Sequence, residues 1–477
     1  MPLPKTKIVC TLGPSSWNPE ILREMIANGM TVARMNGAFT TLDDMRRVSD
    51  VIRSVSKDVA LMIDIKGHEV RLNRFENDVL IAPGDSVIFG SDSSEYIFTE
   101  TYPELYLHIQ AGAHVLVDDG RTLLTVEKVE DKKIFLKVIS GSKIPKGKGI
   151  NIPGVFLDNP PITDKDREQI EFAVKDKWDF VAASFVRNKE DVQAVKELLK
   201  GSHTKVISKI EDSFGLKNID EIITESEGIM VARGDLAVEI PYYQVPHVQK
   251  EIIQKCNAKV KPVIVATQML ESMISNPVPT RAETSDIANA IFDGADAVML
   301  SGETTTGQYP LECVKVMKEI AIETEKIIYQ KSVESNELYE IRCEIRDDGT
   351  RTSMYMAEAA AIISKSKPDA KVIVDTRTGF SARLISSYNI LTNVIAYTPY
   401  EYYARRLALS KGIRAFTKTS GFTTYRDYQD FEMNTVIDLK NRGIVSVNDT
   451  IILVTPSGYS FTTAQHEKAA IKILHIQ

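Results

Sequence analysis

Eight short runs rich in apolar and β-branched residues recur between residues 6 and 303, and stretches with helical periodicity separate most of them. The runs are TKIVCTLG (6–13), TVARMN (31–36), ALMIDIKG (60–67), FVAASF (180–185), TKVISKI (204–210), GIMVAR (228–233), KPVIVATQ (261–268) and AVMLSGE (297–303). Continuous apolar runs are typical of parallel strands buried on both faces. Segments such as 18–29 and 243–258 have the polar and apolar spacing of amphipathic helices. The alternation favours a (β/α)₈ TIM barrel over an open sheet.

One long interval breaks this alternation between the third and fourth strands. It contains short strand-like runs, with Gly and Asp at the turns and no clear helix, which predicts a small β-barrel domain inserted into a barrel loop. After about residue 335 strands and helices alternate again, so we expect a third domain of α/β type. The predicted domains are a barrel of residues 1–68 and 154–334, an inserted lid of residues 69–153, and a C-terminal domain of residues 335–477.

Composition narrows the classes of partner and location. The formal net charge of −7 and the pI near 5.7 argue against nucleic acid as the main partner. No stretch approaches 18 apolar residues, so we expect no membrane span. The four cysteines lie far apart without a C-x-x-C pair, which favours free thiols over a zinc site or a disulfide framework. With no signal-peptide pattern at the start, we expect a cytoplasmic protein.

Polar residues gather where the predicted barrel strands end. They are Asn36, Asp64, Lys66, Ser184, Lys209, Thr267 and Ser301. Barrel active sites form at the carboxyl ends of the strands, because the βα-loops converge there. One or two such residues could simply begin loops, but seven in register predict a site.

Two carboxylates and a lysine stand out within this set. Lys209 and Glu211 are two apart on a strand and so face the same way, which alone is usual for an ion pair. Asp235 follows the next strand and Gly234, where the backbone can approach a ligand closely. Two carboxylates that leave open positions suit Mg²⁺, since substrate oxygens and water complete its octahedron. Two solvated loop acids are the rival interpretation, and Lys209 and Thr267 on the same rim weigh against it.

Several blocks of the barrel together resemble the pyruvate kinase family. They are KTKIVCTLGPSS, ISKIEDSFG, MVARGDL, KPVIVATQMLESM, PTRAE and DGADAVMLSGET, in the family's order and spacing. The resemblance implies transfer of the phosphoryl group of phosphoenolpyruvate to ADP, giving pyruvate and ATP, as the last step of glycolysis. It also implies Mg²⁺ or Mn²⁺ as cofactor, K⁺ as a further cation, a cytoplasmic homotetramer, and a C-terminal domain for regulation and oligomerisation.

The resemblance assigns roles at the barrel mouth. Lys209 matches the family's catalytic lysine, which neutralises charge on the transferring phosphoryl group. Glu211 and Asp235 match the Mg²⁺ ligands. The residues that match the cradle of the pyruvate carboxylate are Ala232, Gly234 and Thr267. Thr267 and Ser301 resemble part of the hydroxyl and water relay that protonates the enolate.

Further matches concern phosphates and the nucleotide. Arg34 and Arg71 match two phosphate-clamping arginines, whose planar forks bind oxygens bidentately. Lys148 matches a lysine that meets the nucleotide phosphates from the hinge of the inserted domain. Pro14 lies where the family holds the base, although a Gly-Pro turn needs no function. Asn36 is also assigned to the nucleotide site.

The chain departs from the family after the second strand. The family usually reads R-x-N-F-S-H-G there, and Ala38 and Phe39 replace its hydroxyl and imidazole. The oxygen donors that remain for K⁺ are Asn36, Asp64 and the carbonyl of Ile65. Glu69 is retained, as in members that need K⁺. These two signals leave K⁺ dependence open.

In the third domain, the segment VDTRTGFSA resembles the family's loop for an effector phosphate. The residues that offer hydroxyls, backbone amides and one cation there are Thr376, Arg377, Thr378, Gly379 and Ser381. An ordinary strand-to-helix turn is the alternative. The segment TPSGYSFTTAQ near the end of the chain departs from the family's usual Gly-rich effector loop.

Two other functions compete with the kinase. Mg²⁺-dependent aldolases and lyases of pyruvate on related barrels also use a Glu and an Asp, but do not need Lys209, two phosphate arginines or Lys148. A catalytically dead sensor of phosphometabolites would be expected to have lost Lys209 or a metal carboxylate, and all are present.

Overall fold

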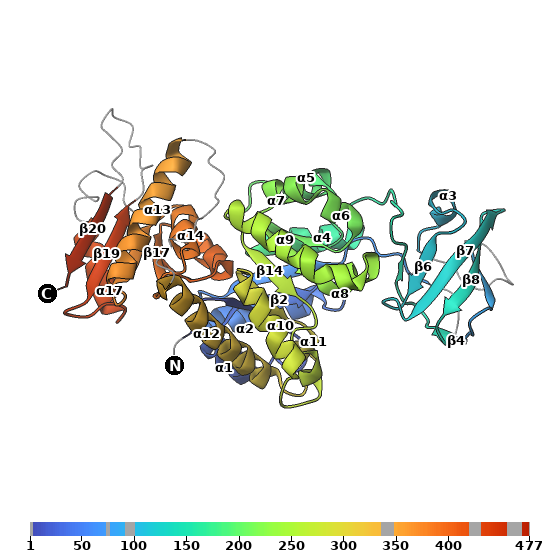
Figure 1. Cartoon of the computed structure of the whole chain (residues 1–477), viewed down its shortest axis with the longest axis horizontal. Coiled ribbons are helices and arrows are strands. Elements are labelled where there is room, and N and C mark those ends of the chain that lie inside the picture. The colour runs from blue at the N-terminus through green and yellow to red at the C-terminus, as the bar shows by residue number, and fades with distance from the viewer. Residues whose placement is uncertain are drawn as a thin grey trace.

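A computed structural model describes residues 3–72, 77–90, 101–334, 348–418, 431–455 and 470–476. The molecule is elongated, with three parts along its long axis (Figure 1). The barrel lies in the middle, the inserted β-strands lie at one end, and the C-terminal α/β part lies at the other. Among the described residues, no helix is long and apolar enough to cross a lipid bilayer.

The central part is a closed barrel of eight parallel strands, which confirms the predicted fold class. The strand order around it is β1-β15-β14-β13-β12-β11-β3-β2. The strands are β1 (Lys7–Thr11), β2 (Met30–Asn36), β3 (Ala60–Ile65), β11 (Phe180–Ala183), β12 (Lys205–Ile210), β13 (Gly228–Ala232), β14 (Val263–Ala266) and β15 (Ala297–Leu300). Seven lie inside one of the eight runs seen in the sequence, and β2 begins one residue before its run.

Helices follow the strands and cover the outside of the barrel. They are α1 (Pro19–Ala27), α2 (Leu42–Val55), α4 (Asp164–Lys175), α5 (Lys189–Leu198), α6 (Ser213–Lys217), α7 (Ile219–Glu225), α8 (Arg233–Glu239), η1 (Tyr242–Gln244), α9 (Val245–Ala258), η2 (Glu271–Ile274), α10 (Arg281–Phe292), α11 (Gly302–Thr305) and α12 (Pro310–Glu334). Local signals set several starts: Thr163 and Thr280 each form a capping box.

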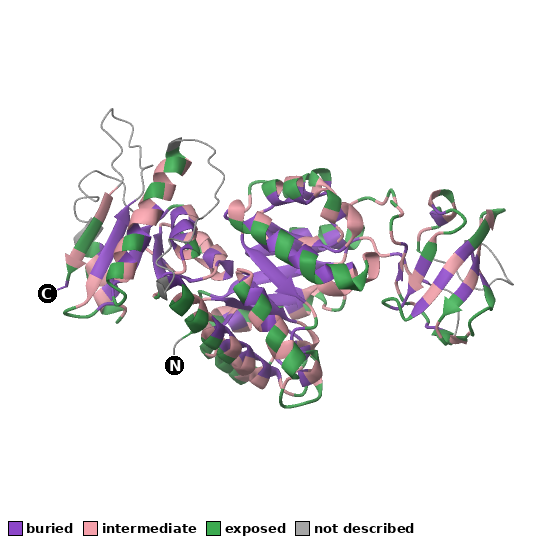
Figure 2. Cartoon of the chain, in the orientation of Figure 1, coloured by how far each residue is buried: buried purple, intermediate pink, exposed green. Residues whose placement is uncertain are grey.

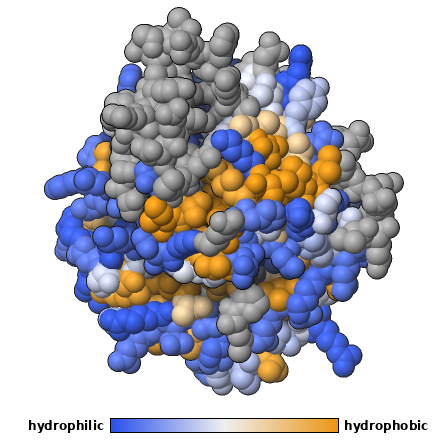
Figure 3. Space-filling model, turned by 90° about the vertical axis from the view of Figure 1, so that its left-hand side faces the viewer, coloured by the Kyte–Doolittle hydropathy of each residue, from blue (hydrophilic) through white to orange (hydrophobic). Residues whose placement is uncertain are grey.

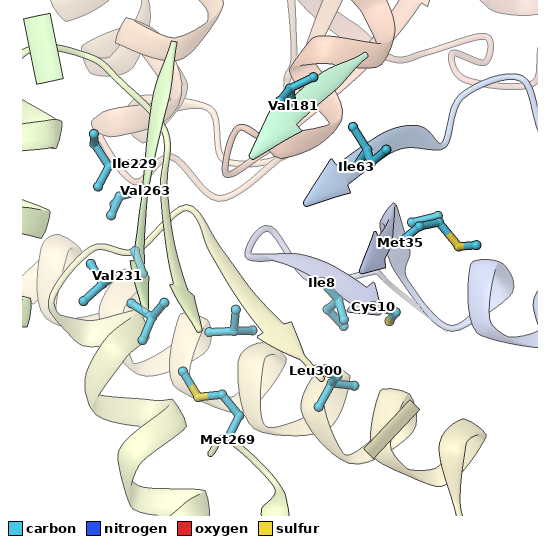
Figure 4. Packing of buried hydrophobic residues seen from close by; sticks show 14 of the residues in the cluster. Ile8, Cys10, Met35, Ile63, Val181, Ile229, Val231, Val263, Met269 and Leu300 are labelled. Atoms are coloured by element: carbon cyan, nitrogen blue, oxygen red, sulfur yellow. The ribbon is translucent and has the colours of Figure 1, made fainter. Parts of the chain in front are cut away.

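The barrel strands are buried on both faces, as their continuous apolar sequence predicts (Figure 2). Outward side chains such as Ile8, Ile63 and Val231 pack in the cluster between strands and helices (Figure 4). Inward side chains such as Met62 and Phe180 fill the barrel itself. The filled interior leaves the carboxyl end as the place where polar side chains can face a ligand.

The insertion between β3 and β11 is an antiparallel β structure with its own core. Its elements are β4 (Val79–Leu80), β5 (Ser86–Gly90), α3 (Leu105–His108), β6 (His114–Val117), β7 (Thr122–Glu130), β8 (Lys133–Ser140), β9 (Lys143–Ile144) and β10 (Ile150–Asn151). In the described residues they form a five-stranded sheet, β10-β6-β7-β8-β5, and the pair β4-β9. Alternate residues such as Leu124 and Leu136 are buried.

The C-terminal part has a five-stranded sheet of order β18-β17-β16-β19-β20, parallel except for β20. Its elements are α13 (Asp348–Ser366), β16 (Lys371–Asp375), α14 (Phe380–Ser387), β17 (Val394–Thr398), α15 (Glu401–Arg406), η3 (Leu407–Leu409), β18 (Ile413–Thr417), α17 (Phe431–Asn441), β19 (Thr450–Thr455) and β20 (Ala470–His475). Leu409 packs with the barrel interior, and Lys7 Nζ donates to the Ile413 carbonyl at 2.6 Å.

Candidate active site

Lys209 is at the centre of a buried polar cluster near the carboxyl end of β12. Its Nζ lies 2.8 Å from Glu211 Oε1 and 3.1 Å from Asp64 Oδ1, and it donates to Ser184 Oγ at 2.6 Å. Burial alone would lower the pKa of Lys209, but the charges of Asp64 and Glu211 outweigh it and raise that pKa. The ammonium is therefore held charged and directed into the barrel mouth.

Arg34 extends this cluster from the neighbouring strand β2. Its Nε and terminal nitrogen lie 2.7 and 2.6 Å from Asp64 Oδ2, and its other terminal nitrogen donates to Thr11 Oγ1 at 2.7 Å. Burial opposes ionisation of Asp64, but Arg34 and Lys209 hold its pKa below the usual value. One carboxylate thus orients two cations, a geometry that suits a multiply charged anion.

Glu211 and Asp235 form the acidic side of the same mouth. Glu211 is buried, and its Oε2 accepts a hydrogen bond from the Phe185 N–H at 2.6 Å. Burial, followed by the charge of Glu211, raises the pKa of Asp235 to about 7. Burial and the charge of Glu211 both oppose the ionisation of Asp235, and a bound cation would offset this, so the donor set fits a divalent metal.

Thr267 follows β14 in a backbone conformation that β-branched residues seldom adopt. Its φ is +70°, and that of Gln268 is +54°. Arg233 holds this turn by donating to the Thr267 carbonyl at 2.6 Å, and it pairs with Asp286 at 2.6 Å. Thr267 Oγ1 accepts from the Gly234 N–H at 2.9 Å. The strained turn therefore places a hydroxyl against the backbone of the loop that carries Asp235.

The other residues matched to the pyruvate and proton-relay sites are on adjacent elements. Ala232 ends β13 two residues before Gly234, and Ser301 follows β15, the strand next to β14. The Ser301 N–H donates to Glu303 Oε2 at 2.7 Å. The barrel thus brings Ala232, Gly234, Thr267 and Ser301 to one rim. Lys209 lies on β12, the strand on the other side of β13 from Thr267.

The residues matched to the nucleotide lie apart from this cluster. Arg71 donates to Glu69 Oε2 at 2.9 Å and to the Gly147 carbonyl at 3.0 Å. Lys148 pairs with Asp118 at 2.9 Å within the inserted strands. Pro14 lies in an exposed turn after β1. Within the described ranges, none of the three contacts Lys209 or Arg34.

The oxygens matched to a K⁺ site are already engaged. Asn36 Oδ1 accepts from the Ala38 N–H at 3.0 Å, and the Ile65 carbonyl accepts from Ser184 Oγ at 2.8 Å. Asp64 is paired with both cations, as described above. Phe39 is 83% exposed, so its ring replaces the family's imidazole without packing into the site. A cation here would have to compete with these hydrogen bonds.

The predicted effector loop connects β16 to α14. Gly379 has φ +87°, and its N–H donates to Thr376 Oγ1 at 2.9 Å. Thr376 and Ser381 are buried, whereas Arg377 and Thr378 are exposed. The turn therefore presents one cation and one hydroxyl to solvent ahead of a helix. Most of the segment TPSGYSFTTAQ lies outside the described residues.

Sequence reasoning missed three residues that position the site. Thr11 supports Arg34, Ser184 joins Lys209 to the Ile65 carbonyl, and Arg233 fixes the strained turn. The sequence places Ser184 among the polar residues at the strand ends, but it does not indicate that Ser184 contacts Lys209. The strand period could have found Thr11, because it lies two residues beyond Val9, which faces the barrel interior.

Comparisons with known proteins place the chain in one family. Family models described as the barrel domain and the alpha/beta domain of pyruvate kinase match residues 3–314 and 355–466. The pyruvate kinase of Geobacillus stearothermophilus is 39% identical over 465 residues, which cover 94% of this chain and 77% of the relative. That of Sporosarcina psychrophila is 42% identical over 422 residues, covering 86% and 71%. A crystal structure of a pyruvate kinase from Cryptosporidium parvum has a TM-score of 0.88 at 34% identity, covering 100% of this chain and 98% of that one.

Proposed function

The chain belongs to the pyruvate kinase family and is an enzyme of the transferase class, and we propose that it moves the phosphoryl group of phosphoenolpyruvate onto ADP. One observation carries the proposal. Lys209 and Arg34 are oriented on a single buried carboxylate, Asp64, and Lys209 also contacts Glu211. Two cations beside a metal-binding pair of acids suit a phosphate ester that carries a carboxylate.

In the proposed reaction, Arg34 and Lys209 bind the phosphate of phosphoenolpyruvate. An oxygen of the ADP β-phosphate attacks the phosphorus, and the bond between phosphorus and the enol oxygen breaks. The phosphoryl group carries spread negative charge in this loose transition state, so a positioned ammonium stabilises it without covalent chemistry. The electron pair of the broken bond stays on the pyruvate enolate, which then takes a proton at carbon to give pyruvate.

The backbone N–H groups and hydroxyl around Thr267 orient the organic acid. Ala232 and Gly234 end and follow β13, and Thr267 Oγ1 lies against the Gly234 N–H, so this rim can hold a carboxylate. Thr267 and Ser301 are on the side from which a hydroxyl and water relay would deliver the proton. The rigid turn held by Arg233 keeps that hydroxyl in one position.

Glu211 and Asp235 would hold Mg²⁺ or Mn²⁺. When bound there, the metal would act as a Lewis acid on the enolate and phosphate oxygens. The raised pKa of Asp235 supports the assignment, because burial and Glu211 both oppose its negative charge in the absence of a cation. We also propose that K⁺ binds the oxygens of Asn36, Asp64 and the Ile65 carbonyl.

The nucleotide would enter between the barrel and the inserted strands. Arg71 pairs with Glu69 at 2.7 Å and Lys148 pairs with Asp118 at 2.9 Å. The side chains of Arg71 and Lys148 remain 32% and 50% exposed, so nucleotide phosphates can reach both cations. We infer that nucleotide phosphates replace these carboxylates as the partners of Arg71 and Lys148. Pro14 would lie against the nucleotide base.

An aldolase or lyase on the same barrel is the second candidate. A coupled assay that reports ATP from phosphoenolpyruvate and ADP separates the functions. A kinase produces ATP only when both substrates and Mg²⁺ are present. An aldolase would instead consume pyruvate with an aldehyde, and a dead sensor would do neither; either result would overturn the proposal.

Assembly, location and regulation are also proposals. The domain limits stated above, the cytoplasmic location and an effector phosphate at residues 376–381 rest on the resemblance. A homotetramer has some support from the C-terminal end of the molecule, where an apolar area crosses the surface (Figure 3). Exposed apolar residues of this part include Tyr355, Ile362 and Ile473. Exposed apolar surface of this extent is typical of protein interfaces.

A further inference from the structure

A cavity of about 610 Å³ lies between the barrel and the C-terminal part. Helices α9, α10 and α12 and the segment before β15 line it from the barrel, and α14 and the segment before β18 line it from the other side. Asp296, directly before β15, places it at the amino end of the barrel strands, opposite the active site. Its volume is within the roughly 300–1,000 Å³ of sites that bind small molecules.

Lys411 enters this cavity from a backbone segment that both walls fix. Its N–H donates to Asp296 Oδ1 at 2.9 Å, and its carbonyl accepts from Ser386 Oγ on α14 at 2.6 Å. The next residue, Gly412, has φ +67°, and a Cβ there would lie 2.3 Å from Ser386 Oγ. Within the described residues, the Lys411 ammonium itself makes no hydrogen bond or ion pair. The backbone is thus fixed while the charge is left available.

Arg383 on α14 is the second cation of the cavity. Its Nε has no contact with solvent and no hydrogen-bond partner in the described part of the chain. No carboxylate of that part pairs with its guanidinium. Burial lowers the pKa of Arg383 and of Lys411, and the charges of nearby carboxylates offset only part of this effect. Partly buried cations without an ion-pair partner are costly, so their presence here indicates a ligand.

Nearby carboxylates do not fill this role, because their oxygens are engaged or too distant. Asp296 accepts from the N–H groups of Lys411 and Val263, at 2.9 and 3.1 Å. Glu325 accepts from two N–H groups at the start of the chain, at 2.9 and 2.6 Å. Glu227 acts on Arg383 through charge alone, without an ion pair.

Asp293 adds a different feature to the lining. One of its oxygens pairs with Lys250, while Oδ2 is buried with no hydrogen-bond partner among the described residues. Ser387 and Asn389 also line the cavity. The walls therefore offer two unpaired cations and further polar groups, which together suit an anion that also carries hydroxyl groups.

We propose that this cavity is a binding site for a small hydroxylated phosphate monoester. Its phosphate would lie between the Arg383 fork and the Lys411 ammonium, since guanidinium binds phosphate oxygens bidentately. Hydroxyl groups of the ligand would meet Ser387 and Asn389, which also line the cavity. The site is separate from the exposed loop of residues 376–381 and does not depend on the proposed phosphoryl transfer.

Calorimetric titration with glycerol 3-phosphate tests the site, with glycerol as the uncharged probe. Mg²⁺ and oxalate are included to occupy the barrel mouth. We expect Arg383→Met with Lys411→Met to weaken glycerol 3-phosphate binding more than tenfold. Arg377→Met, which removes the exposed cation of the effector loop, and Lys326→Met on α12 should retain it. Equal affinity in the double variant, or loss only in Arg377→Met, would overturn the proposal.

A second measurement avoids removing the buried cations. Ser387→Cys places a thiol at the exposed edge of the cavity, and the native Cys10, Cys256 and Cys313 are buried. The fourth cysteine, Cys343, lies outside the described residues, so the experiment is done in a Cys343→Ser background. Glycerol 3-phosphate should slow labelling of this thiol by a maleimide at least severalfold, whereas glycerol should not. An unchanged labelling rate at saturating glycerol 3-phosphate would contradict the assignment even if the other variants unfold.

Discussion

Replacing Lys209 with methionine should have two separable effects, because its ammonium contacts Asp64, Glu211 and Ser184 in a buried cluster. Breaking a buried ion pair costs about 3–5 kcal/mol, since a carboxylate is left uncompensated. We therefore expect the free energy of unfolding to fall by up to this amount in the absence of metal. Chemical denaturation followed by circular dichroism measures it.

The same substitution should slow phosphoryl transfer much more than enolisation. Loss of one positioned charge at a transition state costs about 3–4 kcal/mol, or roughly 10²–10³ in kcat. Exchange of the pyruvate methyl protons with solvent deuterium should survive far better, because it does not move phosphorus. Comparing the two rates in one preparation of folded Lys209→Met protein separates the effects.

Lys205→Met provides a matched control at the other end of the same strand. Lys205 begins β12, at the end of the strand opposite the barrel mouth, and is only partly buried. It should leave both rates within about twofold of the wild type, well under 1.4 kcal/mol. If phosphoryl transfer in Lys209→Met falls less than tenfold (about 1.4 kcal/mol), Lys209 does not stabilise the transferring group.

Three further predictions concern cations and pH. Glu211→Gln or Asp235→Asn should weaken Mn²⁺ binding in a relaxation titration with oxalate, and unchanged affinity in both would remove the metal assignment. We expect K⁺ to activate the wild type only weakly, and Ala38→Ser to lower the half-saturating K⁺ concentration. Negligible wild-type activity without K⁺, together with tight K⁺ saturation that the variant does not improve, would contradict this expectation. Burial raises the pKa of Glu239 to about 7. The folded state then binds the extra proton, so stability should fall from pH 5 to 8, and Glu239→Gln should reduce that fall by about 2–3 kcal/mol in denaturation curves; an equal slope in the variant counts against it.

Much of the fold was predictable because buried parallel strands leave a strong pattern. The eight apolar runs predicted the barrel, since each of its strands coincides with one of them to within one residue. The sequence could not show that Leu409 packs with the barrel interior, because that contact joins segments far apart in the chain. Tertiary packing of this kind leaves no periodic signal.

The site was predictable as a set of residues but not as a set of contacts. The polar residues at the strand ends indicated Lys209 and Thr267 as candidates. No local sequence pattern indicated that Asp64 orients both Lys209 and Arg34. The positive φ of Thr267 was also hidden, because a β-branched residue is disfavoured there and only Arg233 and the surrounding turn maintain it. Pairings across strands depend on barrel closure, which is a property of the whole fold.

The fate of the phosphorus atom tests the central claim most directly. Phosphoenolpyruvate labelled with ³²P is mixed with ADP, Mg²⁺ and the enzyme, and the products are separated by chromatography. The proposed mechanism predicts that the label appears in the γ-phosphate of ATP, one for each pyruvate formed, and that none moves when ADP is omitted. Label released as inorganic phosphate, or pyruvate formed without ADP, would contradict direct transfer at the barrel mouth.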